Sequence, residues 1–221
     1  MTRQPRLIWH LFHHLRSSTS NLRFPSHQLI AILTMTTDLP CPFCNIADIH
    51  KPYDAAHPPA SIDPEKTSPP SFLLLSTPTL IAFLDILPLS RGHLLVSPRE
   101  HRPKLSDTSP LEARRLGAAV RVLSKAVSRA TGVDDWNVVQ NNGAAAAQVV
   151  PHVHYHIIPR PELRAQGKLR ESFTMFGRGT REELDDDEAV VLASDIRQRV
   201  AEIIEEEGKD LLDDFELESK L

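Results

Sequence analysis

The chain has few cysteines and no long apolar run. Its 221 residues include only two cysteines, Cys41 and Cys44, and a lone pair does not resemble the disulfide framework of a small secreted protein. We therefore expect a reducing compartment. The nearest approach to a membrane span is the short apolar stretch 29–33, far below the roughly 18 residues that a spanning helix needs. The sequence therefore predicts no membrane partner.

A surplus of positive charge is also missing. The formal net charge is −4, and because residues 1–37 hold four arginines and no acid, the remainder carries −8. Binding to duplex nucleic acid needs a basic footprint that such a body does not have. We therefore expect no duplex nucleic acid as a partner, which still leaves room for a local pocket that binds a small anion.

Composition divides the chain into three parts. Residues 1–37 have the pattern of a transit peptide, with arginines among apolar and hydroxyl residues and no acid. An unfolded leader is the equal alternative, with Met35 as a second start site, so the expected localisation is cytoplasmic or mitochondrial. Residues 38–161 are expected to form one globular domain. Residues 162–221 are expected to form an extension with one helix and an acidic, solvated tail.

Short β-prone runs precede and follow a well-marked helix. Strands are expected at 72–75, 80–85, 92–96 and 136–140, and the turn signals between the first three favour antiparallel neighbours. Six prolines between residues 52 and 70 predict an ordered excursion or a flexible loop and not a domain linker. We call residues 52–70 the proline-rich excursion.

Two helices follow from capping and periodicity. Ser109 as N-cap, Pro110 in the first turn and Glu112 completing a capping box predict a helix that ends at Gly132. A second helix over about 186–207 begins with acids, as the helix dipole favours, and ends at Gly208. Its expected core stripe consists of Val190, Ala193, Ile196, Val200 and Ile203.

Residues 152–158, His-Val-His-Tyr-His-Ile-Ile, are the most informative in the chain. Side chains alternate along a strand, so His152, His154 and His156 share one face while the residues between them point toward a core. Three rings about 6.5–7 Å apart would repel one another if charged and would need partners if buried. Histidine serves widely as acid, base, nucleophile or ligand, so the pattern indicates a functional site.

The pattern His-φ-His-φ-His-φ-φ, with φ apolar, resembles the signature of the histidine triad (HIT) superfamily of nucleotide hydrolases and transferases. The likeness runs from Cys41 to about Arg160. It includes Cys-Pro-Phe-Cys at 41–44, Ala-Phe-Leu-Asp-Ile at 82–86, Gly-His-Leu-Leu-Val at 92–96, and Gln148 four residues before His152. The resemblance implies that residues 38–161 are a HIT domain of the α+β class, with a five-stranded antiparallel sheet and packed helices, paired into a homodimer.

The chemistry of such a site follows from the charge on a nucleotide. An α-phosphate is negative, so attack on phosphorus needs a neutral nucleophile, fixed in line, and donors for the developing charge. The reference pKa of histidine, about 6.5, makes a neutral ring available at physiological pH. By resemblance His154 is the nucleophile, forming a nucleotidyl-histidine that water resolves, and His156 binds and stabilises the phosphate oxygens.

The resemblance also assigns the binding of a purine nucleotide. Asp85 matches the acid that binds the ribose hydroxyls, and Phe83 and Ile86 match apolar residues of the base pocket. Ordinary strand packing is the alternative for these two apolar side chains. Asn141 and Gln148 match amides that contact phosphate, with a capping or turn role as the alternative for Gln148.

The cysteines suggest a metal. A Cys-x-x-Cys turn supplies two thiolates and needs two more ligands for a tetrahedral zinc site. In HIT proteins that keep both cysteines, the resemblance implies zinc held by Cys41, Cys44, His101 and the first triad histidine, His152. A closed site of four ligands would be structural. Two free cysteines in a turn are the alternative.

Three departures from the HIT pattern bear on activity. Residues 144–147 are alanines where relatives have glycines, so we expect the backbone to approach phosphate differently. Val149 replaces the serine or threonine whose hydroxyl helps to protonate the leaving group. The proline-rich excursion replaces a short connection near the expected base pocket, which puts base preference in doubt.

Within the superfamily, His156 at the third triad position argues against the uridylyltransferase branch, which has glutamine there. Cys-Pro-Phe-Cys and Asn141 look Hint-like, implying hydrolysis of nucleoside phosphoramidates. His-Ile-Ile-Pro-Arg and the acidic helical extension look Fhit-like, implying dinucleoside polyphosphates. We favour a hydrolase of AMP-linked phosphoramidates. The alternatives are a dinucleoside polyphosphate hydrolase and a nucleotide-binding regulatory protein with little catalysis.

Overall fold

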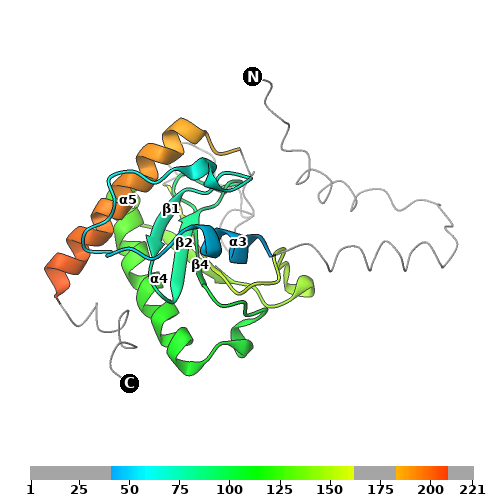
Figure 1. Ribbon diagram of the computed structural model, residues 1–221. Coiled ribbons are helices and arrows are strands. Elements are labelled where there is room, and N and C mark those ends of the chain that lie inside the picture. The colour runs from blue at the N-terminus through cyan, green and yellow to red at the C-terminus, as the bar shows by residue number, and fades with distance from the viewer. Residues whose placement is uncertain (1–40, 162–182, 209–221) are drawn as a thin grey trace, which may run out of the picture. The chain divides into compact units, whose positions relative to one another are not determined.

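The computed structural model describes residues 41–161 and 183–208. Five strands form one antiparallel sheet in the order β1-β2-β3-β5-β4 (Figure 1). The expected leader and acidic tail lie outside the described residues. The strands are β1 (Leu73–Ser76), β2 (Leu80–Leu84), β3 (Leu94–Pro98), β4 (Trp136–Gln140) and β5 (Tyr155–Pro159), and the helices are α3 (Pro42–Ile49), α4 (Pro110–Thr131) and α5 (Asp186–Glu207).

The antiparallel sheet with its packed helices confirms the expected α+β fold, and the strands β1 to β3 are buried on both faces. Successive side chains point to opposite faces. Leu80, Ala82 and Leu84 of β2 enter a large core that α4 and α5 complete. Ile81 and Phe83 enter a smaller core with Phe43 of α3. The continuous apolar runs of β1 to β3 are therefore those of a sheet covered on both sides.

The two long helices were well predicted. In α4 the Ser109 hydroxyl accepts from the amide of Glu112, and the Glu112 carboxylate accepts from the amide of Ser109. Gly132 ends the helix with a φ of 69°. The observed bounds of α5 match the expected ones. One residue of its predicted core stripe is wrong: Val190 is 44% exposed, whereas the other four are buried.

Two local predictions need correction. The Cys-Pro-Phe-Cys segment opens the helix α3, with Cys41 as its N-cap, and is not a turn. The histidine strand begins only at Tyr155, because Val153 bonds outside the ladder: its amide donates to the Arg102 carbonyl and its carbonyl accepts from the Ser97 hydroxyl. His152 and His154 therefore lie in the segment that leads into β5.

Smaller differences concern the ends of strands and the proline-rich excursion. β1 and β3 begin one and two residues later than expected, while β4 has the predicted bounds. The excursion is an ordered part of the domain. It holds a short 3-10 helix at Pro64–Lys66, and the Thr67 hydroxyl donates to the Ser71 hydroxyl. No helix within 41–161 and 183–208 is both long and apolar enough to cross a membrane.

Candidate functional site

The histidine site lies on the face of the sheet that α3 covers. His156 pairs with Leu95 of β3, whose side chain belongs to the smaller core with Phe43 and Phe83. The alternating residue Ile157 lies in the larger core on the opposite face. The predicted separation of histidines from core residues is therefore confirmed for the part of the segment that forms β5.

His154 offers a free ring nitrogen. Its Nδ1 lies 2.6 Å from the carbonyl oxygen of His152, and a carbonyl only accepts, so Nδ1 carries the proton and Nε2 keeps its lone pair. The side chain is buried, and this burial lowers its pKa. The ring is thus neutral at physiological pH, as a nucleophile for phosphorus must be.

His156 has the opposite tautomer. The amide of Leu89 donates to Nδ1 of His93 at 3.1 Å, so the proton of the neutral His93 ring sits on Nε2. That nitrogen lies 3.0 Å from Nδ1 of His156, which must then accept. The proton of a neutral His156 is left on Nε2. With the rings of His154 and His156 4.8 Å apart between centroids, a lone pair and an N–H donor stand side by side.

His93 is a site residue that was not among the residues predicted from the sequence. Besides its contact with His156, its Nε2 lies 3.5 Å from Oδ2 of Asp85. Gly92 allows this placement: its φ is +85°, and a Cβ there would lie 2.8 Å from Cγ2 of Val127 in α4. The signal was present in the Gly-His-Leu-Leu-Val motif, but only the fold brings His93 to the triad.

Asp85 lies at the end of β2, next to the histidines. It is buried, and Oδ1 accepts from the amide of Leu87 at 2.9 Å. Phe83 of the same strand meets Phe43 edge to face at 5.2 Å, and Phe43 meets His154 at 5.1 Å. An aromatic wall therefore adjoins the carboxylate and the free ring nitrogen. Phe43 was not among the predicted site residues, because the helix that carries it was not predicted.

Two predicted substrate contacts, Asn141 and Ile86, lie at the edges of this centre. Asn141 directly follows β4, whose last residue Gln140 pairs with Tyr155 of β5. Ile86 follows Asp85, is half-buried, and its carbonyl accepts from the amide of Leu184. Their contacts with a nucleotide stay predictions.

Gln148 has the turn role that was its alternative. Its Oε1 accepts from the amide of Gly143 at 2.6 Å and its Nε2 donates to the Pro103 carbonyl at 2.7 Å. The Gln148 side chain thus connects both ends of the loop 143–148, which contains the four alanines, to Pro103. A direct phosphate contact by Gln148 stays a prediction. Within the loop, Ala147 has a φ of 63°, a left-handed conformation that costs a non-glycine residue about 1–2 kcal/mol. The missing glycine is therefore tolerated at a cost.

The four predicted metal ligands come together beside the triad. Their ligand atoms all lie within 4.8 Å of one another. Sulfur and Nδ1 are 3.4 Å apart for Cys41 and His152, 3.4 Å for Cys44 and His101, and 3.6 Å for Cys44 and His152. Zinc bonds of about 2.3 Å to sulfur and 2.0–2.1 Å to nitrogen, at a tetrahedral angle, place these atoms about 3.6 Å apart. The spacing therefore fits a zinc ion.

The protonation of this cluster also fits a metal. Nε2 of His152 lies 2.9 Å from the Pro98 carbonyl, so it carries the proton, and Nδ1 turns its lone pair toward the thiols. Burial lowers the pKa of His152 to about 4, which keeps the ring neutral. In the absence of metal, burial and the neighbouring Cys41 raise the pKa of Cys44 to about 12. A zinc ion would stabilise the thiolates of these two half-buried cysteines.

The chain is similar to known proteins. Residues 66–163 match the HIT domain family. The chain is 37% identical over 141 residues to the adenylylsulfatase HINT3 of Arabidopsis thaliana, a match that covers 62% of this chain and 67% of that protein. The chain belongs to the histidine triad (HIT) family. It is also 46% identical over 92 residues to the adenosine 5'-monophosphoramidase hnt1 of Schizosaccharomyces pombe, covering 42% of this chain and 66% of that one.

A solved HIT structure has the same fold. The crystal structure of a Zn-bound histidine triad family protein from Mycobacterium smegmatis matches with a TM-score of 0.53 and 25% identity, and covers 75% of this chain and 96% of that one. The matches to the two sequence relatives span about two thirds of their length. The HIT family, expected from the residues, is therefore confirmed.

Proposed function

We propose that this HIT protein is a nucleotide hydrolase that releases AMP from nucleoside phosphoramidates through a nucleotidyl-histidine at His154. The observation that carries the proposal is the pair of opposite tautomers, a bare Nε2 on His154 beside an Nε2–H on His156. One nitrogen is suited to attack phosphorus and the other to donate to a phosphate oxygen.

The reaction divides into two displacements. Nε2 of His154 attacks the α-phosphorus, the phosphorus–nitrogen bond breaks, and the leaving amine takes a proton. Because Val149 has no hydroxyl to give, that proton comes from water. Water then attacks the phosphorus of the nucleotidyl-histidine, and the bond from phosphorus to Nε2 breaks. AMP leaves, the attacking water gives a proton to the solvent, and His154 recovers its neutral ring. Asp85 would accept from the ribose hydroxyls, and Phe43 and Phe83 would contact the base.

The relatives support this choice of substrate class. One is named as an adenylylsulfatase and another as an adenosine 5'-monophosphoramidase, so both names describe cleavage at an adenylyl group. A dinucleoside polyphosphate would use the same nucleophile and differ in the leaving group. A regulatory protein without turnover would bind AMP and leave both substrates intact.

Replacing the nucleophile tests the proposal. With adenosine phosphoramidate as substrate, His154→Ala should lower the rate of AMP release by more than about 1,000-fold, as loss of a covalent nucleophile does. His57→Ala, at a histidine whose side chain is 85% exposed, is the matched control and should keep full activity. AMP release should be faster from the phosphoramidate than from diadenosine tetraphosphate. AMP release unchanged in His154→Ala contradicts the assigned nucleophile, and wild-type AMP binding without turnover contradicts the hydrolase.

We further propose that Cys41, Cys44, His101 and His152 hold a structural zinc ion. The four sulfur and nitrogen ligands complete a tetrahedron, leaving no open position for a substrate. Such an ion ties α3, which carries Phe43, to the segment that carries His154. The ion would therefore fix the position of Phe43, the proposed base contact, relative to His154, the proposed nucleophile.

Metal analysis tests the zinc proposal. The purified protein should contain one zinc ion per chain, and Cys44→Ser should bind zinc more than about 100-fold more weakly and unfold at a lower temperature. The His57→Ala control should keep its zinc. Wild-type protein that contains no stoichiometric zinc and melts at the same temperature with and without a chelator contradicts the site.

We also propose that the HIT domain forms a homodimer through β4. Among the described residues, this strand lies at the edge of the sheet and pairs only with β5. Trp136 and Val138, two residues apart on one face of it, are 41% and 44% exposed, and an apolar edge of this kind favours association.

The dimer proposal predicts a change of mass. Light scattering should give twice the chain mass for the wild type, and Val138→Lys should shift it toward the monomer, because a buried unpaired charge opposes association. Val191→Lys, at an exposed valine of α5, should remain dimeric. A monomeric wild type contradicts the proposal.

A further inference from the structure

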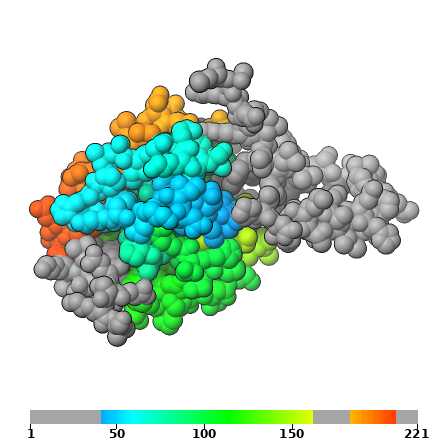
Figure 2. All heavy atoms as spheres, in the orientation of Figure 1, coloured from blue at the N-terminus to red at the C-terminus, as the bar shows by residue number. Residues whose placement is uncertain are grey.

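A cavity separate from the histidine site lies between α5, the start of β1 and the proline-rich excursion. Its volume is about 550 Å³, and none of its lining residues belongs to the triad or to the metal cluster. In the space-filling view the excursion, in cyan, lies between α3, in blue, and α5, in orange (Figure 2). The excursion thus supplies one wall of the cavity and helix α5 the other.

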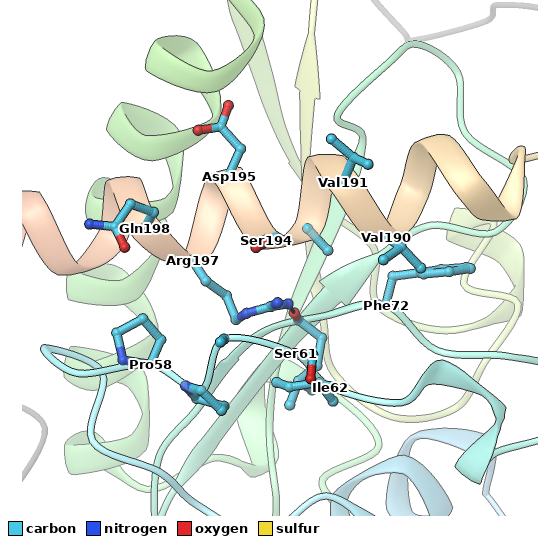
Figure 3. Close-up of a pocket in the computed structure, with 14 residues that line it drawn as sticks. Pro58, Ser61, Ile62, Phe72, Val190, Val191, Ser194, Asp195, Arg197 and Gln198 are labelled. Atoms are coloured by element: carbon cyan, nitrogen blue, oxygen red, sulfur yellow. Dashed lines mark hydrogen bonds between the residues drawn. The ribbon is translucent and has the colours of Figure 1, made fainter.

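The walls are largely apolar. Pro58, Pro59 and Ile62 come from the excursion, Phe72 from the approach to β1, and Val190 and Val191 from α5 (Figure 3). The two valines are 44% and 67% exposed. The cavity also accounts for Val190, which the helical periodicity placed in the core. A volume in this range with mainly apolar walls is typical of sites for small molecules.

One positively charged side chain, that of Arg197, lies among these apolar residues. Arg197 reaches from α5 toward Ser61 of the excursion (Figure 3), and only 5% of the residue is exposed. Nη1 donates to the Leu73 carbonyl at 2.8 Å. Nε is buried without a hydrogen-bond partner among the described residues. The guanidinium therefore has donor capacity on the edge that does not face Leu73.

The described residues provide no counter-charge for Arg197. Asp195, one of the lining residues, pairs instead with Arg199 at 3.2 Å. Tyr53 is the neighbouring titratable group, and burial raises its pKa, so the phenol stays neutral. A guanidinium is charged at every physiological pH, and a buried charge is costly unless it is paired.

We propose that this cavity binds a small organic monocarboxylate with an apolar body, whose carboxylate pairs with the guanidinium of Arg197. A carboxylate matches the planar fork of a guanidinium and accepts two parallel hydrogen bonds. A single arginine balances one negative charge, which favours a monocarboxylate over a doubly charged phosphate monoester. The apolar body would cover the proline, phenylalanine and valine side chains of the walls. This site is independent of the proposed hydrolase activity.

A purely structural role does not use the whole side chain. The hydrogen bond to Leu73 ties α5 to β1, but it needs one of the guanidinium nitrogens only. A neutral donor such as glutamine would serve that contact without bringing a charge into an apolar cavity. The charge itself therefore points to an anion.

Calorimetric titration of the full chain tests the proposal with octanoate, octanamide and octyl phosphate as probes. Octanoate should bind with one molecule per chain, and octanamide, which has the same body and no charge, should bind at least about 10-fold more weakly. Arg197→Gln should weaken octanoate binding by about 10- to 100-fold. Arg197→Lys should recover part of this loss, since it restores the charge without the fork.

Two further variants separate binding from folding. Ser194→Phe fills the cavity from the lining residue Ser194 without changing Arg197, and should abolish octanoate binding while AMP release is unaffected. Arg114→Gln, which removes an exposed arginine of α4 that does not line the cavity, should bind octanoate like the wild type. The proposal is overturned if wild-type protein does not bind octanoate at millimolar concentration, or if Ser194→Phe binds it normally. Tighter binding of octyl phosphate would overturn the choice of a monocarboxylate.

Discussion

The hydrogen bonds that two histidine rings make to backbone carbonyls determine the chemistry of the whole site. Nε2 of His152 donates to Pro98, and Nδ1 of His154 donates to the carbonyl of His152 itself. Each bond fixes one tautomer and leaves the other ring nitrogen with a lone pair. The lone pair of His152 faces two thiols, whereas that of His154 lies beside the N–H donor of His156. The hydrogen bonds to backbone carbonyls thus give the neighbouring residues His152 and His154 different roles.

The same constraint links the fold to the site. The segment 152–154 lies outside the β-ladder because Ser97 and Arg102 take the hydrogen bonds of Val153. Had the strand continued, the His152 carbonyl would have been available for pairing with a neighbouring strand instead of a side chain. Local departure from regular structure therefore gives His154 its orientation. Burial then keeps the ring neutral.

Much of this structure could be predicted from local sequence, and the rest depends on contacts between distant residues. The capping box of Ser109 and the period of α5 are local signals, and both helices were predicted with nearly correct bounds. The four proposed zinc ligands, two cysteines and two histidines, were predicted from spacing and family likeness, and the structure brings them together. His93 reaches His156 across 63 positions of the chain, a contact that no local pattern encodes. Val190 followed the helical period but faces a cavity that only the excursion creates.

The central claim is that His154 and His156 hold opposite tautomers in the free protein. Nitrogen-15 NMR of protein labelled at its histidines measures this directly, with signals assigned by single replacement of each ring. At neutral pH, His154 should carry its proton on Nδ1 with Nε2 unprotonated, and His156 should carry its proton on Nε2. A His154 protonated on Nε2, alone or together with Nδ1, would contradict the account.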